Sequence, residues 1–131
     1  MATIFTRIVN GEIPCHKLAE TDDFFAFLDI NPIARGHALA IPKAELDYVF
    51  DLDDDTLAGL TVFAKKVGKA IEAVVPCERM GIMVAGLDVP HCHVHLVPIN
   101  GIGDLSFANA KAANHDELAA LAEAIRQTLG D

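Results

Sequence analysis

Apolar residues recur along this chain with two different periods, and each period predicts one type of secondary structure. The clearest helical pattern runs from Asp53 to Val75. Its apolar residues are three or four positions apart and should form one stripe that faces a core: Leu57, Leu60, Phe63, Val67, Ala70, Ile71 and Val74. Asp53 is the expected N-cap, and Pro76 ends the helix.

Two further helical patterns lie near the ends of the sequence. Residues 3–10 place apolar side chains at helical spacing, and Gly11 is an expected stop. A second amphipathic pattern runs from Asn114 to about Leu129, and Asn114 followed three residues later by Glu117 resembles a capping box. Its inward positions are predicted to be Leu118, Leu121, Ala122, Ile125 and Leu129.

Five shorter segments have the composition and period typical of strands. They cover residues 16–21, 24–29, 37–41, 80–84 and 91–98. The first two form a hairpin candidate, and residues 85–90 are predicted to be a loop. Residues 1–131 are therefore expected to form a single α+β domain, with an antiparallel sheet of about five strands, one long helix and two terminal helices.

The last predicted strand carries His91, His93 and His95 at alternate positions. On a strand these histidines would share one face, with Cys92 and Val94 on the other. Imidazole titrates near neutral pH and can transfer protons, bind metals or act as a nucleophile. The pattern leaves three interpretations open: histidines satisfied by backbone groups, a metal site, or a catalytic centre with one nucleophilic histidine.

Charge and composition narrow the possible partners. The chain has 19 acidic against 10 basic residues and a formal charge of −9, which disfavours a nucleic acid polymer but not a mononucleotide. No apolar run approaches the length of a membrane span, and no signal-type segment opens the sequence. The three scattered cysteines suggest free thiols. We expect a cytoplasmic protein without membrane contact.

The segment His91-Cys92-His93-Val94-His95, followed by two apolar residues, resembles the signature of the histidine triad (HIT) family of nucleotide hydrolases and transferases. Residues 4–14, 25–32, 35–43 and 86–90 are also similar to family segments, in the same order. The resemblance implies the HIT-like fold and a homodimer in which two sheets join. His95 stands where the transferase branch has glutamine, which favours the Hint-like hydrolase branch.

The resemblance also implies roles for four histidines. His93 would be the nucleophile that attacks the α-phosphorus of a nucleotide, and His91 would orient it. His95 would contact the phosphate or pass a proton to the leaving group. His37 matches an upstream histidine beside the triad, and the alternative is a histidine that simply opens a buried strand.

A nucleotide-binding set follows from the same resemblance. Asp29 matches an acid that accepts hydrogen bonds from the ribose hydroxyls, although it could be an ordinary turn residue. Gly86, Leu87 and Asp88 would form the binding loop beside the phosphate, where Gly86 would let the backbone approach closely. The apolar slot for the base would be lined by residues that could equally be plain core: Phe5, Ile8, Ile13 and Ile30.

This chain departs from the family pattern at several positions. Leu87-Asp88 stands where well-known members have Gln-Ser, and Met83 stands where many have a phosphate-contacting asparagine. Thr3 and Thr6 replace the two cysteines that hold structural zinc in some bacterial members. The sequence therefore predicts no metal and no cofactor.

The resulting hypothesis is a hydrolase that cleaves purine nucleoside 5′-phosphoramidates of the AMP or GMP type, or related phosphoanhydrides, through a covalent nucleotidyl-histidine. Three alternatives remain open at this point: a dinucleoside polyphosphate hydrolase, a non-catalytic nucleotide-binding module and a metalloenzyme.

Overall fold

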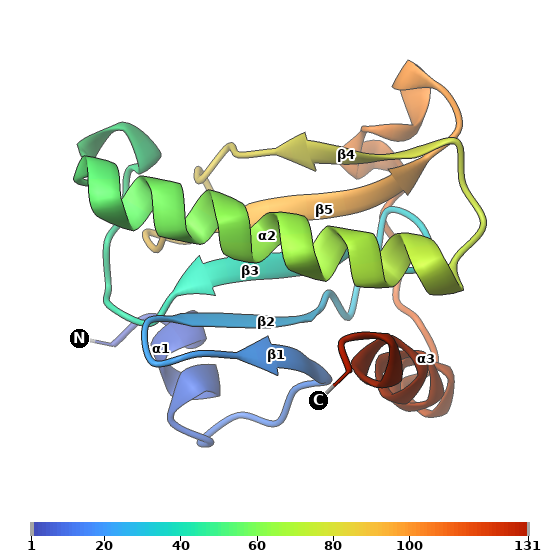
Figure 1. The fold of residues 1–131 in the computed structure, drawn as a ribbon, viewed down its shortest axis with the longest axis horizontal. Helices are drawn as coiled ribbons and strands as arrows, with labels where there is room; N and C mark the ends of the chain where they lie inside the picture. Colours follow the sequence, from blue (N-terminus) through green and yellow to red (C-terminus); the bar gives the residue numbers. More distant parts are fainter. Residues whose placement is uncertain (1, 131) are drawn as a thin grey trace.

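The computed structural model describes residues 2–130, which form a five-stranded antiparallel sheet with helices on both faces (Figure 1). Across the sheet the strand order is β1-β2-β3-β5-β4, so β1 and β4 are the edges. The predicted α+β class and the hairpin of the first two strands are confirmed. The strands are β1 (Lys17–Glu20), β2 (Phe24–Leu28), β3 (Ala38–Pro42), β4 (Arg79–Met83) and β5 (Val94–Ile99).

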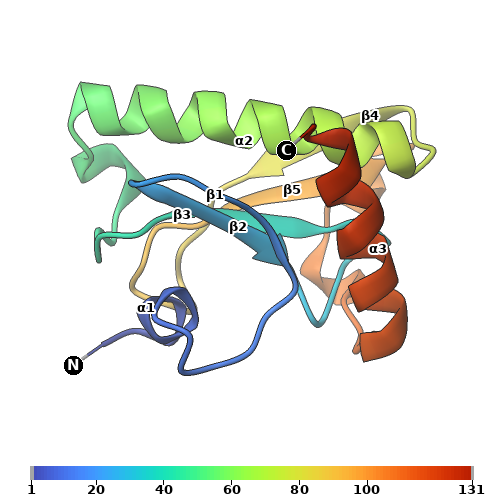
Figure 2. The same cartoon turned by 60° about the horizontal axis from the view of Figure 1, so that its bottom comes forward.

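Three α-helices cover this sheet: α1 (Ile4–Val9), α2 (Asp54–Val74) and α3 (His115–Thr128). Figure 2 shows α2 on one face of the sheet and α1 on the opposite face, with α3 near one end of α2. Each begins after a side chain that accepts a backbone N–H bond from the residue three positions on: Thr3, Asp53 and Asn114. The sequence therefore located all three helices to within one or two residues.

The capping box expected at the start of α3 forms only in part. Glu117 donates its backbone N–H to Asn114 Oδ1 at 3.1 Å, but within residues 2–130 the Glu117 side chain makes no return bond to Asn114. Three short 3₁₀ helices were also not predicted, because such turns are too short to show a period. They are η1 (Val49–Asp51), η2 (Ile102–Asp104) and η3 (Phe107–Asn109).

The main core fills the space between α2, α3 and the sheet. Most of the predicted α2 stripe is buried there, including Leu60, Val67 and Ile71. Leu57 was predicted to face this core, but 36% of it is exposed. Figure 1 shows the reason, because the first turn of α2 reaches beyond the strands.

A second core lies on the opposite face, where α1 packs against β2 and β3. It contains one residue of the helix and four of the sheet: Phe5, Phe25, Phe27, Leu39 and Ile41. Within the described range no helix is both long and apolar enough to cross a bilayer. The functional site lies beside this second core.

Candidate active site

The histidine segment enters the site at the start of β5, but only His95 lies within the strand. The strand begins at Val94, because the ladder with β3 starts at the Ala40–Val94 pair and the ladder with β4 starts at Met83–His95. The predicted strand over residues 91–98 was therefore wrong for its first three residues. These residues are held by loop contacts instead of a ladder: the backbone N–H of His91 donates to the Val89 carbonyl oxygen, and that of Cys92 to the Leu46 carbonyl oxygen.

The predicted facing of the segment is confirmed. Cys92 and Val94 belong to the core beneath α2. The imidazoles lie on the side of α1, where the ring of Phe5 meets His91 and His93 edge-on with centroids 5.7 and 5.0 Å apart. All three histidines are buried, with no more than 4% of each exposed. Their hydrogen bonds therefore decide what each ring can do.

Both ring nitrogens of His91 are engaged. Its Nε2 lies 2.8 Å from the carbonyl oxygen of Pro42, which can only accept, so Nε2 carries the proton. Nδ1 then accepts a bond from the Thr3 hydroxyl at 2.7 Å. The same hydroxyl caps α1 by accepting the Thr6 N–H. These bonds fix the tautomer of His91 and tie the start of α1 to the histidine segment.

His93 is oriented by the backbone of His91. Nδ1 of His93 donates to the carbonyl oxygen of His91 at 2.7 Å, which leaves a lone pair on Nε2. This Nε2 is buried and has no hydrogen-bond partner within the described residues. Asp88 Oδ1 lies 3.3 Å from it without forming a hydrogen bond, because both atoms present lone pairs. An unpaired imidazole nitrogen of this kind can act as a nucleophile.

His95 is oriented by His37. The backbone N–H of Ile33 donates to His37 Nδ1 at 2.9 Å, so His37 carries its proton on Nε2. That Nε2 donates to His95 Nδ1, also at 2.9 Å, and His95 in turn carries its proton on Nε2. Burial, followed by the nearby His37 and His93, lowers the pKa of His95 to about 4. Burial lowers the pKa of His37 as well.

Gly36 allows the chain to reach this position. Its φ is +97°, and a Cβ there would lie 3.1 Å from side-chain atoms of Ile71, Val75 and Pro98. Glycine alone tolerates both the left-handed backbone and the close approach to α2. His37 thus lies against His95 of the triad, and it also immediately precedes the buried strand β3.

Asp29 follows β2 at the rim of the site. Its Oδ1 accepts the backbone N–H of Asn31 at 2.8 Å, and its Oδ2 lies 3.7 Å from His37 Nε2. The turn predicted for this residue is therefore present. Oδ2 still has lone pairs available for a ligand donor.

A cavity of about 270 Å³ connects these groups, which is near the lower end for small-molecule sites. It lies between α1, β2 and the loop that leads to the triad. It brings together eight of the residues predicted to form the site: Phe5, Ile8, Ile13, Asp29, Ile30, Asp88, His93 and His95. His91 and His37 support the lining from behind.

Two predicted binding residues lie outside this lining. Gly86 does not border the cavity, and Leu87 is 97% exposed to solvent. Gly86 has a φ of +75°, so it turns the loop and brings Asp88 to the cavity. The positive φ of this turn is therefore sufficient to explain why the position is a glycine, and no contact between Gly86 and a ligand is required.

Sequence reasoning missed contacts that depend on the path of the chain after β5. The ring of Phe107, in η3, covers His95 edge-on with centroids 5.0 Å apart. Asn31 and Cys15 also line the cavity. Residues 99–113 show no period in the sequence, so nothing there indicated a return to the site.

The two remaining histidines, His16 and His115, match no family position in the sequence. They face each other near the surface, with His16 Nε2 and His115 Nδ1 3.0 Å apart. This pair joins the start of β1 to the first residue of α3. It lies outside the cavity lining and takes no part in the site.

Two groups of side chains can be tested for metal binding. Near α1, a structural zinc of the kind suggested by Thr3 and Thr6 does not fit, because neither residue supplies a thiolate and the Thr3 hydroxyl engages His91 Nδ1. Near the cavity, Asp29, His37 and His95 offer ligand atoms within 4.8 Å of one another. A metal bound by both His37 Nε2 and His95 Nδ1 would have to displace the proton that these two nitrogens share.

Comparisons with known proteins agree with this geometry. The HIT domain model matches residues 10–101. The adenosine 5′-monophosphoramidase hnt1 of Schizosaccharomyces pombe is 44% identical over 75% of this chain and 74% of its own length. An uncharacterized HIT-like protein of Methanocaldococcus jannaschii is 35% identical over 88% of this chain and 94% of its own length.

Solved structures extend the similarity to the whole fold. The crystal structure of a hypothetical histidine triad nucleotide-binding protein from Sulfolobus tokodaii has a TM-score of 0.86 and 29% sequence identity. The match covers 97% of this chain and 91% of that one. The sequence resemblance, the family model and the fold therefore agree, and the chain belongs to the HIT domain family.

Proposed function

We propose that this protein hydrolyses purine nucleoside 5′-phosphoramidates through a covalent nucleotidyl group on His93. The observation that carries the proposal is the buried, unpaired Nε2 of His93, whose ring is held by the carbonyl oxygen of His91. The names of relatives support it, since three are adenosine 5′-monophosphoramidases.

In the first step, the Nε2 lone pair of His93 forms a bond to the α-phosphorus while the phosphorus–amine bond breaks. The departing nitrogen takes a proton from His95 Nε2. In the second step, water forms a phosphorus–oxygen bond, the bond to His93 breaks, and a water proton returns to His95. Covalent catalysis accelerates the reaction because it replaces one difficult displacement at phosphorus with two easier ones.

The low pKa of His95 is compatible with this role. In the free protein His95 is neutral at pH 7, because its pKa is about 4. A bound phosphoryl group brings negative charge next to the ring and raises that pKa, so binding of the substrate favours the protonated form. The bond from His37 orients the neutral ring with Nε2 toward the substrate, and it has to open when His95 Nδ1 takes up a proton.

The nucleoside would occupy the apolar part of the cavity. Asp29 Oδ2 retains lone pairs for the ribose hydroxyls, and Ile30 is half exposed at the rim, where a base could cover it. Phe5, Ile8 and Ile13 supply further apolar lining. Burial of a base against these side chains would provide binding energy that is independent of the reacting phosphorus.

We also propose that the protein is a homodimer joined at β4. This strand is an edge of the sheet, and its Ile82 is 58% exposed. A groove between β4 and α2 is lined by Ile82, Met80 and Gly68, with charged side chains of both elements at its sides. The sheet covers most of the α2 stripe, so little of that stripe is left for a partner. An exposed edge strand with apolar neighbours is normally covered by a partner.

The phosphoramidase proposal is tested with adenosine 5′-phosphoramidate as substrate. We expect release of AMP by the wild-type protein and loss of turnover in His93→Ala. Nucleotide binding should persist in that variant, because the base and ribose contacts come from other residues. His95→Ala should be slower by about 10²- to 10⁴-fold. Wild-type turnover by His93→Ala would exclude the proposed nucleophile.

A further inference from the structure

Asp88 has no role in the mechanism above, although its carboxylate lies 3.3 Å from the nitrogen that would attack phosphorus. Its Oδ1 also accepts the backbone N–H of Val89 at 3.1 Å, which holds the carboxylate toward the site. The side chain is 74% exposed, whereas that of His93 is 1% exposed. Asp88 therefore stands between the buried nucleophile and the solvent.

This position lies on the path of the leaving group. In an in-line displacement, the leaving atom lies on the side of phosphorus opposite the attacking nitrogen. A phosphorus atom bonded to His93 Nε2 would take the space next to the Asp88 carboxylate. The leaving group would then extend outward, past Asp88 and into solvent.

The charges around the cavity are one-sided. Asp29 and Asp88 line it, and among residues 2–130 no lysine or arginine does so. Histidine and backbone groups can hold a single phosphoryl group here. A leaving group that adds further negative charge would face the Asp88 carboxylate without a compensating cation.

We propose that Asp88 selects the leaving group by charge. It favours a nucleoside monophosphate joined through a P–N bond to an amine that carries a second, positively charged group. It disfavours anionic leaving groups such as the nucleotide released from a dinucleoside polyphosphate. This inference rests on the proposed function. Asp88 neither makes nor breaks a bond in it and acts only through its charge.

The test uses three AMP phosphoramidates whose leaving amines have similar size but different charge. Ethylenediamine carries a distal ammonium, propylamine is neutral at its distal end, and glycine carries a carboxylate. A unit charge about 5 Å away changes the rate by about tenfold at an effective dielectric constant of about 40. The wild-type kcat/KM should therefore favour the ethylenediamine over the glycine compound by about 100-fold.

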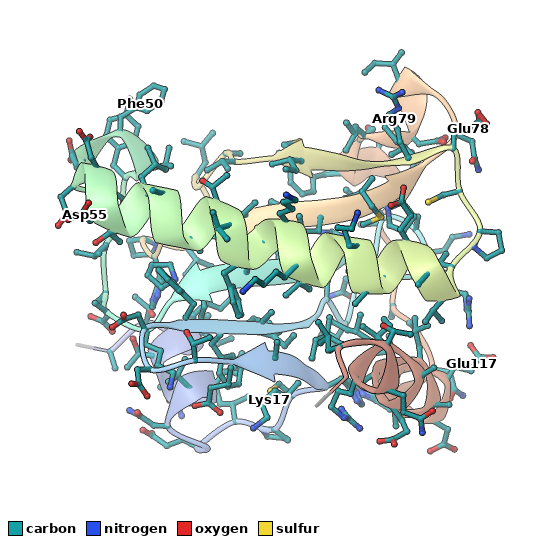
Figure 3. The ribbon with its side chains drawn as sticks, in the orientation of Figure 1. Lys17, Phe50, Asp55, Glu78, Arg79 and Glu117 are labelled. Carbon is teal, nitrogen blue, oxygen red and sulfur yellow. The ribbon has the colours of Figure 1, made fainter. Side chains whose placement is uncertain are left out.

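Asp88→Asn should abolish this preference, with the kcat/KM ratio of the two charged substrates falling to near one. Asp55→Asn makes the same change of charge at the start of α2, where Figure 3 labels the residue. Helix α2 covers the face of the sheet opposite α1 and the cavity (Figure 2), so this variant should keep the wild-type ratio. Equal ratios in the wild type and Asp88→Asn would overturn the inference, whatever the absolute rates.

A binding measurement separates this inference from the proposed function. The aminoethyl, propyl and carboxymethyl phosphodiesters of AMP present the same charges without the P–N bond, and calorimetry gives their Kd values. If no phosphoramidate is hydrolysed, the proposed function fails. The role of Asp88 is then decided by the ratio of the Kd of the aminoethyl ester to the Kd of the carboxymethyl ester. This ratio must differ by at least tenfold between the wild type and Asp88→Asn, and a smaller difference would overturn the inference.

Discussion

The buried His95 should make the free energy of unfolding depend on pH, and replacing His95 with a residue that does not titrate should remove this dependence. Its pKa is about 4 in the folded protein against 6.5 for an ordinary histidine, chiefly because of burial. Between these two values the unfolded chain binds more protons than the folded one. The free energy of unfolding is therefore unaffected by His95 above about pH 6.5 and decreases as the pH falls toward 4. Below about pH 4 this residue causes no further decrease.

The expected magnitude follows from these pKa values. The full difference corresponds to about 3 kcal/mol, and about 2 kcal/mol of it falls between about pH 7 and pH 5. Only 4% of His95 is exposed, so solvent screening of this contribution is small. Most carboxylates remain ionised in this range, so their own protonation adds little.

The assay is urea unfolding of the wild type and His95→Asn at about pH 7 and pH 5. Asparagine keeps an oxygen that can accept the bond from His37 Nε2 but does not titrate. The loss of stability on acidification should be about 2 kcal/mol smaller in the variant. Some loss should remain, because burial also lowers the pKa of His37.

A matched control separates titration from simple destabilisation. Val97 is a fully buried residue of β5, and Val97→Ala should cost about 2 kcal/mol at both pH values, because it removes two buried methyl groups. Its dependence on pH should equal that of the wild type. If His95→Asn also kept the wild-type dependence, the explanation based on a buried, neutral His95 would be wrong.

Three further predictions concern the surroundings of the site. Thr3→Ala should lower the free energy of unfolding by about 2 kcal/mol in the same urea assay, because it removes the α1 cap and leaves His91 Nδ1 unpaired. Thr3→Ser keeps the hydroxyl and should retain most of the wild-type stability. Light scattering should give about twice the chain mass for the wild type and the single-chain mass for Ile82→Lys, whereas a wild-type monomer would exclude the proposed dimer. Dialysis against a chelator should change neither the phosphoramidase rate nor the melting temperature, and stoichiometric zinc whose removal stops turnover would contradict the metal-free mechanism.

The elements that the sequence predicted well are those whose period is repeated and whose ends are marked. The α2 helix has several turns of apolar stripe, an Asp53 cap and a following Pro76, and its observed range agrees with the prediction. The exposed Leu57 was an error because the period locates a helix face, but does not tell how far the sheet beneath it extends.

The histidine segment shows where local pattern is insufficient. Alternation identified which side chains share a face, but the start of the strand depends on where its ladders with β3 and β4 begin. His91 is held by Pro42 and Thr3, both remote in sequence, and no local signal reports such bonds. Phe107 was missed for the same reason, since its contact with His95 depends on the whole path after β5.

The family resemblance suggested roles for the histidines that their spacing alone left open. The hydrogen bonds of the structure show which ring nitrogen of each histidine carries the proton. Ile33, His37 and His95 form one chain of donors and acceptors that places a proton on His95 Nε2. Nothing in the residue types at these positions indicates that order. It depends on the backbone N–H of Ile33, which the turn before β3 directs at His37.

Direct detection of the covalent intermediate tests the central claim. The wild-type protein is mixed with adenosine 5′-phosphoramidate, quenched rapidly at alkaline pH and digested for peptide mass spectrometry. The proposed mechanism predicts an acid-labile adenylyl group bonded through nitrogen to His93, and none in His93→Ala. An adduct on another residue, or wild-type turnover by His93→Ala, would contradict it.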